Sequence, residues 1–352
     1  MEYIYFDDFN FYETSTFSDN FTFCDNSEVK DFKRVYVPSL YAIIFLAGLL
    51  GNSLVIVTKV LYEKLKTMTD IYMMNLAIAD LILLCTLPLW AVAAYNEWTF
   101  GTVMCKVVTG VYTVNFNSCM LILTCVAVNR YHAIVQATKM PKNKRTHGMF
   151  ICAAVWVLAI ILALPEFILS ETISDESGKT ECIMNYPPNS NNTIEIGVRV
   201  TQMTVGFLIP FVTMIICYTI ITITLLKAKG FQKHKSLKII AAVVIVFMIC
   251  ELPYNIALLL LTVQITSKEK TSCEYNTYIA YAIIVTESIA YIHCCLNPIL
   301  YVFLGVKFRN NFLKILKDVG CVSQKQLHGY LKTECETSQQ RTCVSETTMY
   351  PL

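Results

Sequence analysis

Seven long apolar segments constrain this chain more than any other feature of its sequence. Each has the roughly 20 mostly apolar residues that a helix needs to cross a bilayer at about 1.5 Å rise per residue. Transmembrane β-strands are excluded, because they have about 9–11 residues of alternating polarity. The sequence therefore predicts an all-α membrane protein with a seven-transmembrane helix bundle, at Tyr36–Leu61, Ile71–Ala94, Val103–Val135, Met149–Leu169, Val198–Leu226, Leu237–Leu261 and Tyr278–Val302.

The scarcity of charged residues agrees with this prediction and excludes other classes. Only 15% of the 352 residues are charged, against about 25% in soluble domains. The net charge of +2 is too small for nonspecific nucleic-acid binding, which needs a strong basic excess. No Cys/His cluster has the spacing of a zinc site, and no catalytic triad or phosphate-binding loop stands out. We therefore expect neither an enzyme nor a nucleic-acid partner.

Basic residues predict the orientation in the membrane. With the N-terminus outside, the inner loops and the C-terminal tail hold 20 of the 28 Lys and Arg residues, in line with the positive-inside rule. The start of the chain lacks the features of a cleavable signal peptide, so the first helix is expected to act as an uncleaved insertion signal. The predicted parts are an extracellular acidic arm (1–35), the bundle (36–303), an amphipathic helix 8 on the inner leaflet (304–320) and a cytoplasmic tail (321–352).

The predicted outer segments carry their own chemistry. Acidic residues alternate with tyrosines in the arm, and tyrosine beside aspartate suits sulfation. Such an arm would attract a basic partner by electrostatic steering, although a solvated tail is the simpler interpretation. Asn20 and Asn191 lie in N-glycosylation sequons. Four cysteines fall in the oxidising exterior and allow three pairings: Cys24, Cys105, Cys182 and Cys273.

Ionisable residues within the predicted helices are costly to bury and indicate functional sites. Four stand out, Asp80, Arg130, Glu251 and Glu287, each of which could instead be a polar group satisfied by interhelical hydrogen bonds. Prolines are also expected to interrupt or bend five of the helices, because a proline removes one backbone hydrogen bond. They are Pro88, Pro165, Pro210, Pro253 and Pro298.

Along nearly its whole length the chain resembles a rhodopsin-like (class A) G-protein-coupled receptor. The matching motifs occur in order and in register: Gly51-Asn52, Leu76-Ala-Ile-Ala-Asp80, Cys105, Asn129-Arg130-Tyr131, Trp156, Pro210, Tyr218, Pro253 and Asn297-Pro298-Ile-Leu-Tyr301. Within that class it resembles a chemokine receptor, through Thr86-Leu-Pro88 with Trp90, Leu252-Pro253-Tyr254-Asn255, Val285-Thr-Glu287, the acidic arm and the extra outer pair Cys24 and Cys273. Three shorter stretches, at 103–106, 120–125 and 230–234, are similar to a CXC-type member.

The resemblance implies a ligand and a way of binding it at the plasma membrane. It pairs Cys105 with Cys182, and Cys24 with Cys273. A chemokine of CC or CXC type, a small basic protein, would dock on the arm, at Tyr3, Tyr5, Asp7, Asp8 and Tyr12. Its flexible N-terminus would then enter a pocket within the bundle, formed by Trp90, Tyr112, Tyr254 and Glu287.

The resemblance also implies a core network and an output end. The network would hold water or a sodium ion, the only ligand of cofactor type expected, at Asp80, Asn115, Cys119, Glu251, His293 and Asn297. A heterotrimeric G protein of inhibitory type would couple to the inner end, driving calcium release and chemotaxis, at Asn129, Arg130, Tyr131, Tyr218 and Tyr301. Arrestin would bind the phosphorylated tail, and Cys321 is a palmitoylation candidate.

Asn129 departs from the family pattern, which usually has an aspartate before the arginine. A hydrogen bond that Arg130 donates to the amide oxygen of Asn129 restrains the arginine less than an ion pair would, by about 1 kcal/mol. Either basal signalling is raised, or the protein is an atypical receptor that scavenges chemokines without G-protein coupling. Retention of Arg130, Tyr218 and Tyr301 favours signalling. A transporter would show internal repeats or paired charges along one pathway, and neither is evident.

Overall fold

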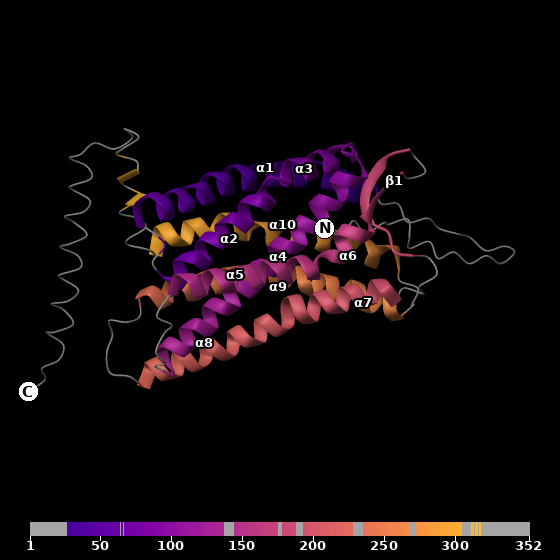
Figure 1. Ribbon diagram of the computed structural model, residues 1–352. Coiled ribbons are helices and arrows are strands. Elements are labelled where there is room, and N and C mark those ends of the chain that lie inside the picture. The colour runs from indigo at the N-terminus through magenta and orange to yellow at the C-terminus, as the bar shows by residue number, and fades with distance from the viewer. Residues whose placement is uncertain are drawn as a thin grey trace, which may run out of the picture.

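The computed structural model describes residues 27–63, 65, 67–136, 144–174, 178–187, 193–227, 235–267 and 272–304, with five further residues between 311 and 317. Seven helices in these ranges are long and apolar enough to cross a membrane, which confirms the predicted bundle. Their spans are Ser27–Leu61, Met68–Tyr95, Gly101–Ile134, Arg145–Leu162, Thr193–Lys227, Val244–Ser267 and Cys273–Ile299. The helices run side by side, with a small β-hairpin at one end (Figure 1).

Several spans contain a second helical element or continue into one. The first combines α1 (Ser27–Val57) with a π-helical segment, η1 (Thr58–Glu63), and the second combines α2 (Met68–Leu84) with α3 (Leu87–Tyr95). The third is α4 (Gly101–Ile134), and the fourth joins α5 (Lys144–Leu162) to α6 (Leu164–Leu169). The fifth contains α7 (Thr193–Thr201), the π-helical η3 (Gln202–Leu208) and α8 (Ile209–Lys227), and the last two are α9 (Lys235–Ser267) and α10 (Cys273–Leu304).

Several helices extend beyond the apolar segments that predict them. The first begins at Ser27 rather than near Tyr36, so residues 27–35 of the predicted arm are helical. Glu28 lies in its first turn, and Glu274 lies in the first turn of α10. A negative charge at a helix N-terminus is stabilised by the helix dipole. These helices thus continue into polar turns that the hydropathy of the sequence predicts to be loops.

The prolines divide into two groups. Pro88 lies in the first turn of α3, after a break at Cys85 and Thr86, and Pro165 lies in the first turn of α6. The first turn tolerates proline, because its N–H groups have no intrahelical acceptor. By contrast, α9 and α10 continue through Pro253 and Pro298.

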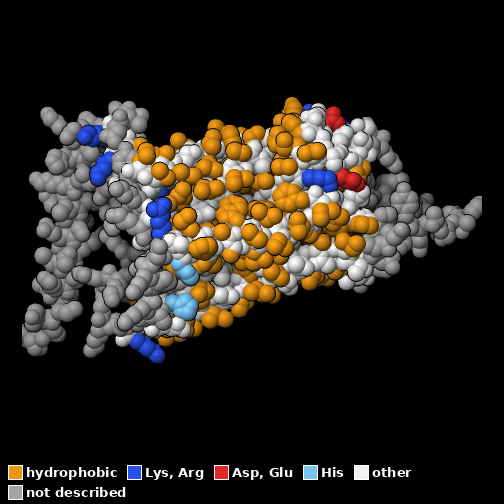
Figure 2. Space-filling view, in the orientation of Figure 1, with side chains coloured by type: hydrophobic (Ala, Val, Ile, Leu, Met, Phe, Trp, Pro, Cys, Tyr) orange, Lys and Arg blue, Asp and Glu red, His pale blue; other side chains and the backbone are white. Residues whose placement is uncertain are grey.

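The bundle buries several polar and charged side chains in its core and exposes many apolar ones on its surface. Asp80 has no exposed surface, whereas Leu50 is 75% exposed. Figure 2 shows the outward-facing hydrophobic side chains as a continuous belt, with charged side chains toward its two ends. Such a belt matches the hydrocarbon core of a bilayer, in which only internally satisfied polar groups are stable.

The β-hairpin lies in the loop between the fourth and fifth spans and was not predicted from the sequence. Strands β1 (Ser170–Ser174) and β2 (Thr180–Met184) are antiparallel, with Thr172 opposite Cys182. Gly178 has a φ of 81° in the turn, a conformation that favours glycine. The hairpin contacts α4 and covers one end of the bundle (Figure 1).

The N-terminus of α2 is fixed by a capping box. The Thr67 hydroxyl accepts a hydrogen bond from the Asp70 backbone N–H at 3.1 Å, and the Asp70 carboxylate accepts one from the Thr67 N–H at 3.0 Å. We expect Thr67→Ala to destabilise the protein by about 1 kcal/mol. The measurement is the thermal midpoint of the purified protein in lipid nanodiscs, with Thr67→Ser as the control. Equal midpoints for Thr67→Ala and the wild type would contradict this role of Thr67.

Little of the predicted amphipathic helix 8 falls within the described residues. Asn311, Phe312, Lys314, Ile315 and Lys317 are helical, and the remainder of 304–320 lies outside the described part of the chain. This helix therefore stays a prediction.

Candidate functional site

The outer end of the bundle is closed by a disulfide between Cys105 and Cys182, as the resemblance implied. Their Cα atoms are 5.6 Å apart, and the bond ties β2 to the first turns of α4. The hydroxyls of Thr102 and Thr172 form a second link, at 2.7 Å. The Trp98 backbone N–H donates a third, to the Thr180 carbonyl at 2.7 Å. The hairpin is thereby held over the pocket end of the bundle.

Only one cysteine of the second predicted disulfide lies within the described residues. Cys273, at the start of α10, is disulfide-bonded. Its predicted partner Cys24 lies outside the described residues. The pairing between the two therefore stays a prediction.

A cavity of about 70 Å³ lies between α4, the fifth span and α9. Tyr112 and Phe116 from α4 line it, together with Tyr254 from α9 and Met184 from the hairpin. The rings of Tyr112 and Tyr254 make an edge-to-face contact with centroids 6.4 Å apart. Two of the four predicted pocket residues, Tyr112 and Tyr254, thus lie together in a cavity wall.

Glu287 lies within α10, is 8% exposed and does not line this cavity itself. Its carboxylate is within electrostatic range of Tyr112, Tyr291 and Lys33. The Tyr112 and Tyr291 rings contact each other with centroids 5.4 Å apart. A buried carboxylate bordered by tyrosine rings can receive a cation, because aromatic faces and the negative charge both attract one.

Trp90, the fourth predicted pocket residue, occupies an adjoining position. It has no exposed surface and packs against Trp98, with ring centroids 5.2 Å apart. Both rings belong to the hydrophobic cluster that surrounds the Cys105–Cys182 disulfide. The ring of Trp90 does not line the cavity.

Sequence reasoning missed Glu166, a buried carboxylate in the cavity wall. It accepts a hydrogen bond from the Gln202 amide at 2.6 Å, which joins the fourth span to the fifth. Its position inside the apolar segment Met149–Leu169 was the available signal. Gln202 gave no such signal, because uncharged polar residues are common in helices.

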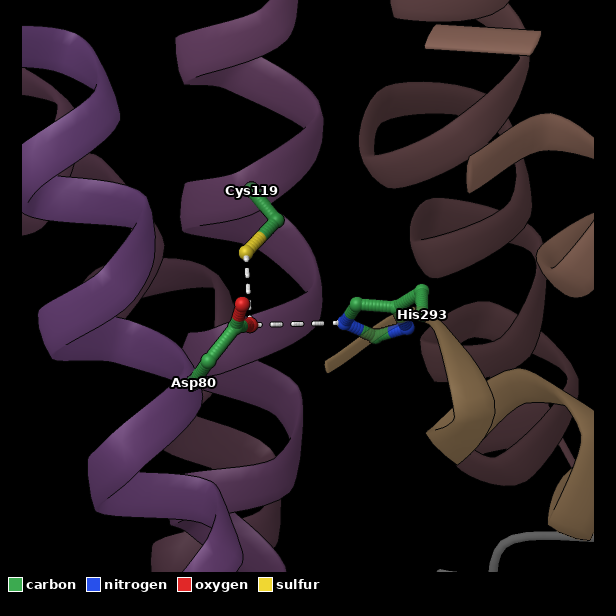
Figure 3. A group of neighbouring side chains, drawn as sticks. All are labelled: Asp80, Cys119 and His293. Atoms are coloured by element: carbon green, nitrogen blue, oxygen red, sulfur yellow. Dashed lines mark hydrogen bonds and ion pairs between the residues drawn. The ribbon is translucent and has the colours of Figure 1, made fainter. Parts of the chain in front are cut away.

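The predicted core network is assembled in the centre of the bundle. The Asp80 carboxylate accepts hydrogen bonds from the amides of Asn297 at 3.0 Å and Asn115 at 3.4 Å. The Cys119 sulfur lies 3.9 Å from Asp80 Oδ1. His293 Nε2 lies 3.6 Å from the same oxygen. Figure 3 shows the contacts of Asp80 with Cys119 and His293.

Glu251 joins this network from α9 through His293. The Glu251 carboxylate lies 3.1 Å from His293 Nδ1, a direct contact that requires no bridging water. Both side chains are almost completely buried. All six residues of the predicted network are therefore in one chain of contacts.

The donor set of this network does not suit a sodium ion. Hard cations prefer oxygen ligands, but Asp80 is faced by two amide nitrogens, a thiol and an imidazole nitrogen. Cys119 supplies sulfur near the carboxylate, and His293 supplies nitrogen. The expected sodium ion thus remains a prediction that these side chains do not favour.

At the inner end, Arg130 contacts a residue that the sequence did not indicate. Its Nη2 donates a hydrogen bond to the Thr69 hydroxyl at 2.7 Å, from α4 to α2. Among the described residues, no hydrogen bond joins Asn129 to Arg130, and the Tyr218 hydroxyl has no partner. The Tyr131 ring contacts that of His132. Tyr301 lies in α10, but its side chain is outside the described part.

The remaining predicted sites fall on residues outside the described ranges. They are the arm residues Tyr3, Tyr5, Asp7, Asp8 and Tyr12, the sequons at Asn20 and Asn191, and Cys321. Sulfation, glycosylation and palmitoylation at these positions stay predictions.

The fold and the buried polar network together define a seven-transmembrane receptor of the rhodopsin class. The family model described as 7 transmembrane receptor (rhodopsin family) matches residues 51–301. The chain is also 43% identical to C-C chemokine receptor type 9 of Mus musculus, over 94% of this chain and 91% of the relative. It is 41% identical to C-C chemokine receptor type 7 of Homo sapiens, over 86% of this chain and 81% of the relative.

The chain belongs to the chemokine receptor family, and it is a multi-pass plasma-membrane receptor rather than an enzyme. A third relative, C-C chemokine receptor type 6 of Homo sapiens, is 42% identical over 86% of this chain and 82% of its own length. These relatives are C-C receptors, whereas three short stretches of the sequence resembled a CXC-type member.

Proposed function

We propose that this receptor binds a small basic chemokine of C-C type and activates an inhibitory-type heterotrimeric G protein, driving calcium release and chemotaxis. The relatives named above are C-C chemokine receptors, which supports this subclass. The observation that carries the proposal is the buried carboxylate of Glu287, within electrostatic range of Tyr112 in the cavity wall. Arrestin is the proposed partner of the tail, and the function requires no cofactor.

Binding proceeds in two steps in this proposal. The chemokine body docks on the acidic arm, and long-range attraction between opposite charges speeds this encounter. The chemokine N-terminus then enters the bundle, where its amine or a basic side chain meets Glu287 and competes with Lys33 for that carboxylate. A desolvated ion pair is not reliably a large gain in affinity. Glu287 is therefore assigned to triggering, and the outer surface to most of the affinity.

Transmission depends on a change of helix packing. Ligand contacts with Tyr112 on α4 and Tyr254 on α9 bias the bundle toward a second arrangement, in which the inner end of α9 moves about Pro253. Arg130 and Tyr218 at the inner end then meet the G protein. Resting and active arrangements need differ by only a few kcal/mol for a ligand to shift the population.

Asn129 favours a second candidate, an atypical receptor that internalises chemokine without G-protein activation. Arg130 lacks the neighbouring carboxylate with which the family usually restrains it. The deciding experiment measures inhibitory G-protein activation in cells exposed to a panel of C-C and CXC chemokines. Activation by a C-C member is the expected result. Uptake of chemokine without activation by any member would establish the scavenging function instead.

Glu287→Gln tests the division between triggering and affinity. The substitution keeps the shape of the side chain and removes its charge, so we expect signalling potency to fall about tenfold and binding affinity less than about threefold. Radioligand binding and G-protein activation are measured on the same cells. Glu274→Gln, an exposed carboxylate on the same helix, is the control and should change both readouts equally if it changes either. Equal losses for Glu287→Gln would contradict its triggering role.

A further inference from the structure

Three metal-binding side chains from three helices converge in the centre of the bundle. Asp80 comes from α2, Cys119 from α4 and His293 from α10, and all three are buried. One ligand atom from each lies within 4.8 Å of the other two. Figure 3 shows the side chains pointing toward one another. Carboxylate, thiolate and imidazole are the three ligand types that zinc takes in proteins.

The contacts of His293 direct Nδ1 away from this cluster and Nε2 toward it. Nδ1 lies 2.5 Å from the Ala290 carbonyl, which can only accept, and 3.1 Å from the Glu251 carboxylate. The proton is therefore held on Nδ1. Nε2 faces Asp80 Oδ1 at 3.6 Å and also lies 3.4 Å from the Cys294 sulfur. A lone pair facing a carboxylate is repulsive unless a cation lies between them.

The separations are close to those of a tetrahedral site. With zinc–sulfur at about 2.3 Å and zinc–nitrogen or zinc–oxygen at about 2.0 Å, neighbouring ligand atoms lie roughly 3.3–3.5 Å apart. The observed separations are 3.9 Å for Cys119 Sγ to Asp80 Oδ1 and 3.6 Å for His293 Nε2 to that oxygen. These two separations differ from the tetrahedral values by a few tenths of an ångström, and the third, between Cys119 and His293, is within 4.8 Å.

We propose that Asp80, Cys119 and His293 form an interhelical site for Zn²⁺ or a similar thiophilic divalent cation. Three protein ligands leave the fourth tetrahedral position open, for water or for the Asn297 amide oxygen. That oxygen is buried and has no hydrogen-bond partner among the described residues, while the amide nitrogen of Asn297 bonds Asp80 at 3.0 Å.

The surroundings suit a divalent cation in charge and orientation. Binding of the ion converts the Cys119 thiol to a thiolate and releases its proton to water, and the thiolate and the Asp80 carboxylate together balance the two positive charges of the ion. Glu251 on His293 Nδ1 completes a carboxylate–histidine–metal arrangement, in which the outer carboxylate orients the ring. Phe116, which lines the cavity, is about one helical turn from Cys119 in α4.

The ion would link α2, α4 and α10 and so stabilise this packing of the bundle. Any ligand that binds one packing better than another shifts the population toward it. Without a metal, a second proton on His293 would make the ring a positively charged imidazolium next to the Asp80 carboxylate. An experiment must therefore distinguish the metal-bound site from a metal-free site in which His293 is doubly protonated.

The test uses full-length receptor in lipid nanodiscs, purified through a tag without histidines and treated with a chelator. Co²⁺ is added first, because a cobalt–thiolate bond has a charge-transfer absorption that neither imidazole nor carboxylate ligands produce. Zn²⁺ is then titrated to displace Co²⁺, and thermal midpoints are recorded with Zn²⁺ or Na⁺. Cys119→Ser removes the sulfur ligand, and Cys152→Ser, a buried free cysteine on α5, is the matched control.

We expect a cobalt–thiolate band and a zinc-dependent rise in the midpoint for the wild type and for Cys152→Ser. In Cys119→Ser the band should disappear and the zinc affinity should fall at least about tenfold. His293→Asn, which removes a different ligand, should weaken zinc binding to a similar extent and serves as a second variant if Cys119→Ser does not fold. A wild type without the thiolate band, or one that Na⁺ stabilises more than Zn²⁺, would overturn the proposal. So would equal zinc binding by the wild type, Cys119→Ser and His293→Asn.

Discussion

Removing the Cys105–Cys182 disulfide is expected to abolish most chemokine binding. The two cysteines are 77 residues apart in the sequence, and closing a loop of that length contributes about 4 to 5 kcal/mol in the chain-entropy model. The bond also positions β2, which carries Met184 into the cavity wall. We therefore expect the double variant Cys105→Ser/Cys182→Ser to bind chemokine at least tenfold more weakly and to unfold at a lower temperature.

The double variant is preferable to either single variant, because it leaves no unpaired thiol to form wrong disulfides. Surface-exposed receptor is counted with an antibody to an N-terminal tag, and chemokine binding is expressed per surface molecule. Cys85→Ser, an exposed free cysteine on the second span, is the control for the substitution itself. Full affinity and an unchanged thermal midpoint in the double variant would show that the hairpin is held by its other contacts alone.

The helical bundle could be predicted because membrane insertion is a local property of the sequence. Each apolar segment must satisfy its own backbone hydrogen bonds in lipid, so length and hydropathy suffice to find it. The ends of the helices were less predictable. Residues 27–35 are helical although they are polar, because the turns at a membrane surface can be both solvated and hydrogen-bonded.

The β-hairpin could not be predicted from its own residues. The strand sequences Ser170–Ser174 and Thr180–Met184 are short and lack a regular apolar alternation. Their pairing depends on the disulfide at Cys182 and on contacts with α4. Tertiary context rather than local propensity thus determines this element.

In the candidate sites, too, the features set by local sequence could be predicted and those set by contacts between helices could not. Asp80, Glu251 and Glu287 could be found as charges within apolar segments, but Glu166 was overlooked among them. Contacts between helices could not be found in this way. Sequence spacing gives no zinc pattern for Cys119 and His293, because the ligands come from separate helices and meet only in the folded bundle.

Thr69→Val is expected to raise signalling in the absence of chemokine. The Thr69 hydroxyl accepts a charge-assisted hydrogen bond from Arg130 at 2.7 Å, the contact that takes the place of a neighbouring carboxylate. Such a bond contributes about 1.5–3 kcal/mol, which corresponds to roughly a 10- to 150-fold shift between two packings. Valine keeps the branched shape and removes the hydroxyl, so basal G-protein activation should increase up to the ceiling set by full activation.

Two companion variants make this expectation specific. Thr69→Ser retains the hydroxyl and should keep basal activity close to that of the wild type. Asn129→Asp places a carboxylate beside Arg130 and should lower basal activity several-fold, in line with about 1 kcal/mol of added restraint. Basal activation is measured by G-protein dissociation in intact cells at matched surface expression.

The opposite signs of Thr69→Val and Asn129→Asp separate signalling from scavenging. Both substitutions change a contact of Arg130, one to Thr69 and one to residue 129. The effects of the two substitutions on basal activation should therefore not add up in the double variant. A receptor that signals through Arg130 must respond to them in opposite directions. If basal and chemokine-stimulated activation stay at zero in every variant while uptake persists, the Arg130–Thr69 contact is only structural. The scavenging function would then replace the one proposed here.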